Sequence, residues 1–276
     1  MSRKSRFMEW GYSSVIAVIS LIMVYPLLFM IINSFKNNKE LFSNYWGLPT
    51  VFRYENYVRA WVDGKLSMYA YNSVLVTVTA TLAALIMSTM LSYAIVKLRF
   101  KGANIVFLCI LFAMFIPDEM NIVPRFLLLN DLGLIGTHWN LFIVYAVGAL
   151  GMSTFILRNF MLSIPGELAE AAAIDGSGDW GVFFKIYVPL VVPVLLSVTI
   201  LIINGIWGEY VWALVSVTDD KLRTLPIGLT VFQSLHGSNY GPLMAGLCIM
   251  TIPIIVLFTV FTRQFVEGMT SGTVKG

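Results

Sequence analysis

The sequence predicts an all-α integral membrane protein with six transmembrane helices. Of the 276 residues, 58% are hydrophobic and only 12% are charged, whereas about a quarter of the residues of a soluble domain are charged. Apolar stretches that approach or exceed the about 20 residues needed to cross a bilayer recur along the chain. Because lipid offers the backbone no hydrogen-bond partners, we expect these stretches to be helices rather than strands.

Five spans are predicted from length and apolar composition, at 12–33, 71–96, 139–157, 186–207 and 242–261. The first follows a basic start that resembles a secretory signal. It is too long for a signal core and no clear cleavage site follows it, so we expect a retained span. The sixth is predicted at 104–124, where a short apolar core must continue through Pro117, Asp118 and Glu119. Neither a repeat nor a linker divides the sequence, so 1–276 is expected to be one transmembrane domain.

The basic residues of the short loops predict the orientation, because such residues stay in the cytoplasm. With six spans, they all fall on one side: Arg3, Lys4, Arg6, Lys97, Arg99, Lys101, Arg158, Lys185, Arg263 and Lys275. Both termini are therefore expected in the cytoplasm.

Several function classes lack their sequence signals. Cys109 and Cys248 lie in apolar runs and are expected to pack there, and His138 and His236 are isolated, so no metal site is expected. The net charge of +3 comes without a dense basic face, which argues against a nucleic-acid partner. We find no phosphate-binding loop for ATP and no set of catalytic residues, so the chain is not expected to be an enzyme.

The loop 163–188 between the fourth and fifth spans is expected to form a helix–turn–helix outside the membrane. Ser163 and Pro165 favour a helix start, the following stretch is rich in alanine, and Gly176 stands where a helix C-cap is expected. Asp179 is expected to cap a second helix. This second helix is predicted at 180–187. Pro189 is predicted to begin the fifth span.

The first of these helices has features of a docking element. Ala171, Ala172 and Ala173 are small enough for another surface to approach the backbone, and Glu170 and Ile174 share a face. This pattern suits a short helix pressed into the groove of a partner. The alternative is a plain amphipathic connector.

The same residues resemble the coupling loop of ATP-binding-cassette importer permeases. The shared pattern is E-A-A-x-x-D-G followed by I-x-x-P, here 170–176 and 186–189. In that family, the loop docks into a cleft on a separate ATPase subunit. The resemblance implies an ATPase-coupling role for the following residues: Glu170, Ala171, Ala172, Ile174, Asp175 and Gly176.

Shorter pieces resemble the carbohydrate branch of this family, the maltose-type six-span permeases. They include Asn72-Ser73, Tyr93-Ala94, Trp207-Gly208-Glu209, 225–229 and the terminus 272–276, where Thr273 departs from the usual alanine. The resemblance implies that the chain lies in a bacterial cytoplasmic membrane and forms half of the translocation pathway for a sugar. It implies four kinds of partner: membrane lipid, a second permease subunit, two ATPase subunits that bind ATP and Mg, and an extracellular or periplasmic sugar-binding protein. This chain itself is expected to hold no cofactor, and its tail, 264–276, is expected to contact the ATPase pair.

The residues that meet the sugar are less strongly indicated. Candidates for the substrate pathway, which combine aromatic and hydrogen-bonding groups, are Asn204, Trp207, Glu209 and Tyr210. The alternative is that these aromatic residues mark the membrane interface. Asp118 and Glu119 are candidates as intramembrane acids, or they are simply wet beyond the end of the third span.

Two other functions remain open from the residues alone. A secondary transporter driven by an ion gradient would favour acids at the membrane midplane, and clear ones are missing. A subunit without a pathway of its own is the other alternative.

Overall fold

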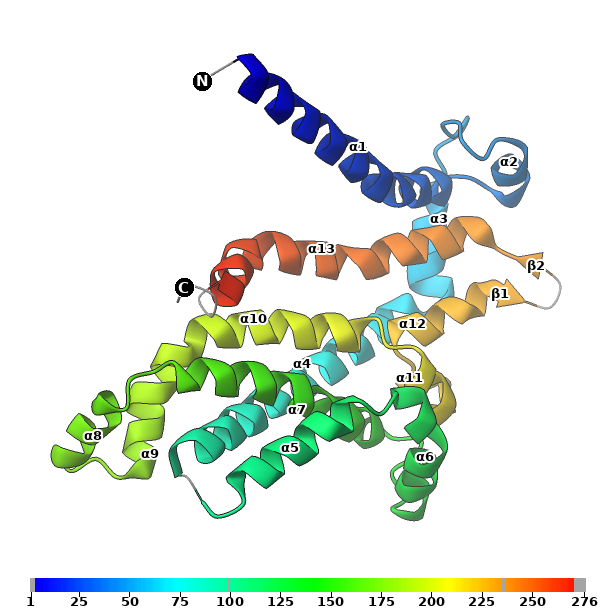
Figure 1. Ribbon diagram of the computed structural model, residues 1–276. Helices are drawn as coiled ribbons and strands as arrows, with labels where there is room; N and C mark the ends of the chain where they lie inside the picture. The colour runs from blue at the N-terminus through cyan, green and yellow to red at the C-terminus, as the bar shows by residue number, and fades with distance from the viewer. Residues whose placement is uncertain (1–2, 99, 235–236, 271–276) are drawn as a thin grey trace. The chain divides into compact units, whose positions relative to one another are not determined.

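A computed structural model describes residues 3–98, 100–234 and 237–270, and the side chains of 11–98, 100–233 and 239–262. Within these residues the chain is helical apart from turns, irregular segments and one pair of two-residue strands (Figure 1). Five helices are long and apolar enough to cross a membrane, and a bent helix pair brings the number to six if it counts as one span. The all-α class with several membrane spans is confirmed, while the count of six and the orientation of the termini stay predictions.

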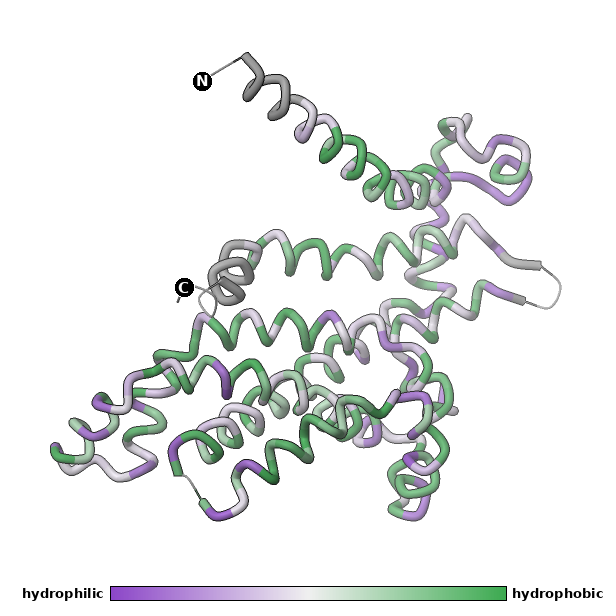
Figure 2. The backbone as a smooth tube through the Cα atoms, viewed as in Figure 1, coloured by the Kyte–Doolittle hydropathy of each residue, from purple (hydrophilic) through white to green (hydrophobic). Residues whose placement is uncertain are grey.

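The helices that contain the five clear spans reach or pass both ends of the predicted stretches (Figure 2). They are α1 (Arg3–Ser34), α4 (Leu66–Tyr93) continued by η2 (Ala94–Leu98), α7 (His138–Leu162), α9 (Asp179–Val182) continued by η4 (Phe183–Tyr187) and α10 (Val188–Trp207), and α13 (Tyr240–Thr270). Helical hydrogen bonds continue past the apolar stretch, because polar residues can extend a helix beyond the hydrocarbon. In the apolar part of α1, Gly11–Ser34, no residue before Asn33 is buried within the chain. A helix that is apolar on all sides and unburied suits a lipid environment.

The third span is not one helix, which corrects the prediction for 104–124. Helix α5 (Ala103–Met114) ends before Pro117, and η3 (Asp118–Asn121) and α6 (Ile122–Asp131) continue at an angle of 97° to it. Pro117 has an extended backbone (φ −57°, ψ 134°). Its ring disfavours a helical conformation of the residue before it, and it cannot donate a backbone hydrogen bond. The break therefore falls where the apolar run meets the two acids.

The chain forms two compact units. The first contains the residues up to Ser67 together with Gly228–Ile252, and the second contains Met68–Ile227 together with the residues from Pro253. The unit boundaries fall within α4, α12 (Leu225–Gly228) and α13. The assignment of 1–276 to one domain stays a prediction.

In the first unit, polar contacts hold the segment after α1 against the start of α13. The Asn56 amide donates to the carbonyls of Ser34 and Lys36 at 2.7 and 3.0 Å. A Cβ atom on Gly241 would lie 2.4 Å from the Lys36 carbonyl oxygen, so only glycine permits this approach. The smaller elements of the unit are α2 (Asn38–Ser43), α3 (Glu55–Val58), η1 (Arg59–Asp63), η6 (Leu229–Phe232), β1 (Gln233–Ser234) and β2 (Gly237–Ser238).

In the second unit, α10 and α5 pack against α7. The buried apolar core includes Leu141 and Leu157 of α7 and Val194 and Val198 of α10. Figure 1 shows α8 (Glu167–Ile174) and α9 at one end of α7 and α10. Helices α6 and α11 (Val211–Ser216) lie at the other end. The unit is completed by η5 (Asp220–Leu222) and α12, whose bounds Leu225–Gly228 cross into the first unit.

Some predictions concern residues that are not described. Those for Arg99, His236, Thr273 and Lys275 lie outside the described residues, as do the side chains of Arg3, Lys4, Arg6 and Arg263. Both cysteines are free thiols: Cys248 is buried, and Cys109 is exposed within this chain.

Candidate functional site

The segment 163–188 forms a hairpin of two helical arms, as predicted, and α8 is its first arm. Ala169 and Ala172, three residues apart on α8, pack against the apolar cluster beneath it. Glu170 and Ala171 are exposed on the other side, and Ile174 at the end of the helix is 87% exposed. Five of the six predicted coupling residues are exposed, and the sixth, Ala172, is half-buried. The helix thus presents a small-residue face and an isolated apolar tip.

Gly176 ends α8 in the way that the sequence predicts. Its φ of +82° is left-handed, a conformation that side chains resist. The Gly176 N–H donates to the Ala173 carbonyl at 3.0 Å, and the Ser177 N–H donates to the Ala172 carbonyl at 2.9 Å. These two bonds form a Schellman motif, which satisfies carbonyls that the helix end leaves free. A Cβ atom at Gly176 would meet nothing within 4 Å, so the backbone angle and not lack of room favours glycine.

Three local predictions for the hairpin were wrong. Helix α8 begins at Glu167, and the Ser163 hydroxyl donates to the Phe160 carbonyl at the end of α7 instead of capping α8. Gly178 takes the N-cap position of α9, so Asp179 is its first residue and not its cap. Pro189 does not begin the fifth span, because α9, η4 and α10 follow one another without a gap. Proline fits within the first turn of α10, where its missing N–H costs little.

An aromatic cluster joins the hairpin to the ends of the spans. Tyr93 of α4 lies 5.0 Å from Phe183 and 5.2 Å from Tyr187, measured between ring centroids. The Tyr93 hydroxyl donates to the Asp179 carbonyl at 3.0 Å. Met161 of α7 is fully buried in the same cluster. Through this cluster, α8 is packed against side chains of α4, α7 and α10.

The sequence does not predict this cluster as a unit, although its members stand in segments that the sequence analysis singles out. Tyr93 belongs to a short piece of the family resemblance, and Phe183 and Tyr187 stand four residues apart, on one face of a helix. Phe183 and Tyr187 belong to the π-helical η4, and Tyr93 directly precedes the π-helical η2. Such irregular turns are often found at functional sites.

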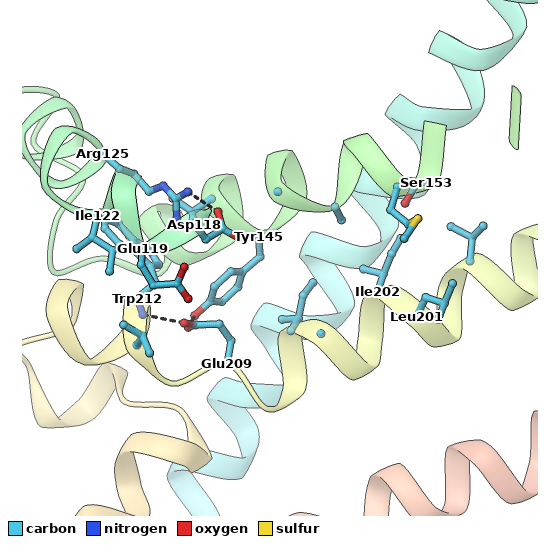
Figure 3. Close-up of a pocket in the computed structure, with 18 of the residues that line it drawn as sticks. Asp118, Glu119, Ile122, Arg125, Tyr145, Ser153, Leu201, Ile202, Glu209 and Trp212 are labelled. Carbon is cyan, nitrogen blue, oxygen red and sulfur yellow. Dashed lines mark hydrogen bonds and ion pairs between the residues drawn. The ribbon is translucent and has the colours of Figure 1, made fainter. Parts of the chain in front are cut away.

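A cavity of about 380 Å³ lies at the opposite end of the second unit (Figure 3). Its walls come from α7 and α10 and are apolar, with Val144, Met152 and Leu201 among them. Its polar end is formed by η3, α6, α11 and the loop after α10. The polar, charged and aromatic residues there are Asp118, Glu119, Arg125, Tyr145, Glu209 and Trp212.

Glu209 holds the polar end together. Its carboxylate accepts hydrogen bonds from the Tyr145 hydroxyl and from the backbone N–H groups of Trp212 and Ala213. The last two are free N–H groups of the first turn of α11, so Glu209 caps that helix from outside. The Trp212 indole N–H donates to the Asn140 side chain at 2.9 Å, which fixes the ring.

One of the four candidates for the substrate pathway lines this cavity, and three do not. Glu209 lines it, whereas Asn204, Trp207 and Tyr210 are not among its lining residues. Trp207 is buried in the second unit, and Asn204 and Tyr210 are exposed. Their roles stay predictions.

The two acids beside the third span line the same cavity. The Asp118 side chain is 80% exposed and forms an ion pair with Arg125 at 2.8 Å. The structure thus brings Asp118, Glu119 and Glu209, from two distant parts of the sequence, to one end of one cavity. Sequence patterns could not join them, because no periodicity connects η3 with the segment after α10.

Two pieces of the family resemblance that are far apart in sequence also meet. The Asn72 amide donates to the carbonyls of Lys221 and Arg223 at 2.8 and 2.9 Å. The Ser73 hydroxyl accepts from the Leu225 N–H at 2.8 Å. Asn72 therefore anchors a loop to α4.

Residues 80–271 match the family of binding-protein-dependent transport system inner membrane components. This match covers well over half of the chain. The chain belongs to this family. It is therefore a multi-pass membrane protein of a binding-protein-dependent transport system, and the resemblance found around 170–176 is confirmed at this level.

Relatives match over most of their length. A probable ABC transporter permease protein, YurM of Bacillus subtilis, is 37% identical over 252 residues, covering 91% of this chain and 84% of YurM. The arabinooligosaccharides transport system permease protein AraQ of Halalkalibacterium halodurans is 35% identical over the full length of both chains. The trehalose/maltose transport system permease protein MalG of Thermococcus litoralis is 31% identical over 94% of each chain.

A solved structure supports the fold. A chain from a bacterial ABC transporter involved in the import of the acidic polysaccharide alginate aligns with a TM-score of 0.82 over 96% of this chain and 99% of its own. The two sequences are 24% identical. The likeness shows that the arrangement of helices is that of an ABC transporter chain.

Proposed function

We propose that the chain is a permease subunit of an ATP-binding-cassette importer and forms half of the translocation pathway for a carbohydrate. The observation that carries the proposal is the set of relatives that match this chain nearly end to end and are named as permeases for oligosaccharides. The cavity of the second unit supports it, because a hydrogen-bonding end beside apolar walls suits the mixed faces of a sugar. Family membership makes a secondary transporter driven by an ion gradient the less favoured function.

The complete importer would contain a second permease subunit, two ATPase subunits and an extracellular sugar-binding protein. One solved relative of this fold is described in complex with an alginate pentasaccharide-bound periplasmic protein. The ATPase subunits would bind ATP and Mg, and this chain would bind neither. All six spans would cross the bacterial cytoplasmic membrane, with both termini in the cytoplasm.

Within this importer, α8 would dock into the ATPase. The helix exposes Ala171 and leaves Ile174 almost fully in solvent, although an isolated apolar side chain gains from burial against a partner. Closure of the ATPase pair would push α8, and the aromatic cluster of Tyr93, Phe183 and Tyr187 would pass the movement to the spans. Access to the cavity would then alternate because nucleotide biases two conformations.

The proposal is tested by uptake into proteoliposomes that contain the whole importer. Glu170→Lys reverses a charge on the exposed face of α8, and Gly176→Pro replaces the left-handed backbone with a fixed φ of about −65°. Both variants should lose nearly all ATP-driven sugar uptake while their insertion into the membrane stays normal. Asp131→Asn, an exposed acid at the end of α6, is the matched control. Normal uptake by both hairpin variants would refute the coupling role.

A further inference from the structure

The polar end of the cavity carries more acids than bases. Three carboxylates line it: Asp118, Glu119 and Glu209. Among the described lining residues, Arg125 is the one basic side chain. The balance of formal charge at this end is therefore negative.

Arg125 is already engaged by groups of this chain. Its guanidinium nitrogen lies 2.8 Å from a carboxylate oxygen of Asp118, and the group lies 5.3 Å from the centre of the Trp212 ring. The side chain is 23% exposed, so little of it faces water. An acidic ligand would have to share Arg125 with Asp118, which already neutralises its charge.

The other two carboxylates keep their charge unopposed. All the hydrogen bonds that Glu209 accepts come from neutral donors, a hydroxyl and two backbone N–H groups. No basic side chain in the described part of the chain forms an ion pair with Glu119 or Glu209. A negative group brought to this end of the cavity would therefore be repelled by like charge.

We infer that the cavity accepts neutral sugars and amino sugars and rejects sugars that carry carboxylates, such as uronic acids. The inference rests on the proposed function and adds the class of substrate. Hydroxyl groups of a neutral sugar donate to carboxylates without a charge penalty, and the ammonium of an amino sugar forms charge-assisted hydrogen bonds with them. A uronic acid adds a carboxylate, and Arg125, the one basic side chain among the described lining residues, is already paired with Asp118.

The test measures binding to the whole, nucleotide-free importer in detergent, without the extracellular binding protein, which has its own specificity. The probes are three trisaccharides of the same linkage: a neutral hexose, its uronic acid counterpart and its 2-amino counterpart. Equilibrium dialysis gives each dissociation constant. The uronic acid trisaccharide should bind at least about tenfold more weakly than the neutral one, because like charges cost energy on this scale.

Variants connect the result to this cavity. The gap is the ratio of the dissociation constants of the uronic acid and neutral trisaccharides. Glu119→Gln keeps the shape of the side chain and removes one charge, so it should reduce this gap several-fold. Glu119→Lys should abolish the gap or reverse the preference. Glu209→Gln neutralises a second carboxylate at the polar end of the cavity. Asp131→Asn removes an exposed charge outside the cavity and should leave the gap unchanged.

The outcomes separate the inference from the proposed function. Equal binding of neutral and uronic acid probes by the unaltered importer overturns the inference alone. A gap that persists in Glu119→Gln, Glu119→Lys and Glu209→Gln also overturns it, because another part of the importer would then select. Failure of every probe, with uptake also absent, refutes the carbohydrate function itself.

Discussion

Glu209 shows how one side chain can serve both a fold and a site. Its carboxylate caps α11 through the N–H groups of Trp212 and Ala213, and it receives the Tyr145 hydroxyl from α7. The carboxylate that borders the cavity thus also fixes two of the elements around it. A substitution there is expected to change stability as well as ligand binding.

Glu209→Ala should lower the thermal stability of the purified protein. The variant removes the acceptor of two N–H groups and one hydroxyl, and each unsatisfied group costs about 1–3 kcal/mol where water does not replace the partner. Thermal unfolding in detergent, followed by intrinsic fluorescence, measures the loss. Glu209→Gln keeps one acceptor oxygen and should lose less. An unchanged midpoint in the alanine variant would show that water satisfies the helix end.

At the scale of elements, we expect the break in the third span to separate lipid from water. Helix α5 is apolar, whereas η3 carries Asp118 and Glu119 directly after Pro117. The acids gain from hydration, and proline ends the helix where they begin. We therefore expect η3 to be wet and α5 to be in lipid.

Cysteine labelling tests this boundary. In a background in which serine replaces Cys109 and Cys248, Met120→Cys should react with a membrane-impermeant maleimide added outside the cell, because Met120 is exposed on η3. Leu108→Cys, in the middle of α5, should stay unlabelled. Protection of Met120→Cys would mean that the third span continues straight through residue 120.

The sequence predicts the helices better than it predicts their exact ends and the contacts between them. Long apolar runs locate five spans, because a bilayer imposes one length and one composition. The limits of α8 and α9 were missed because Ser163, Gly166, Gly178 and Asp179 are all acceptable near helix ends, and packing selects among them. The cavity was largely missed for another reason. Its polar end joins η3 to the segment after α10, and only the packing of α7 against α10 brings them together.

At the scale of the whole molecule, the two candidate sites lie toward opposite ends of the second unit. The hairpin lies at one end and the cavity at the other, with α7 and α10 running between them (Figure 1). Since helices packed side by side move as bodies, the proposed function expects a push at α8 to alter the cavity without any contact between nucleotide and ligand. We expect the apolar part of α1, which is not buried before Asn33, to face lipid or another subunit.

The most direct test of the account asks whether α8 is a cytoplasmic docking helix. In the background without native cysteines, Ala171→Cys is exposed to a membrane-impermeant maleimide in inside-out vesicles, with the ATPase subunits first removed and then restored. The account predicts rapid labelling in stripped vesicles and strong protection once the ATPase rebinds. Labelling only in right-side-out vesicles, or labelling that the ATPase does not slow, would contradict it.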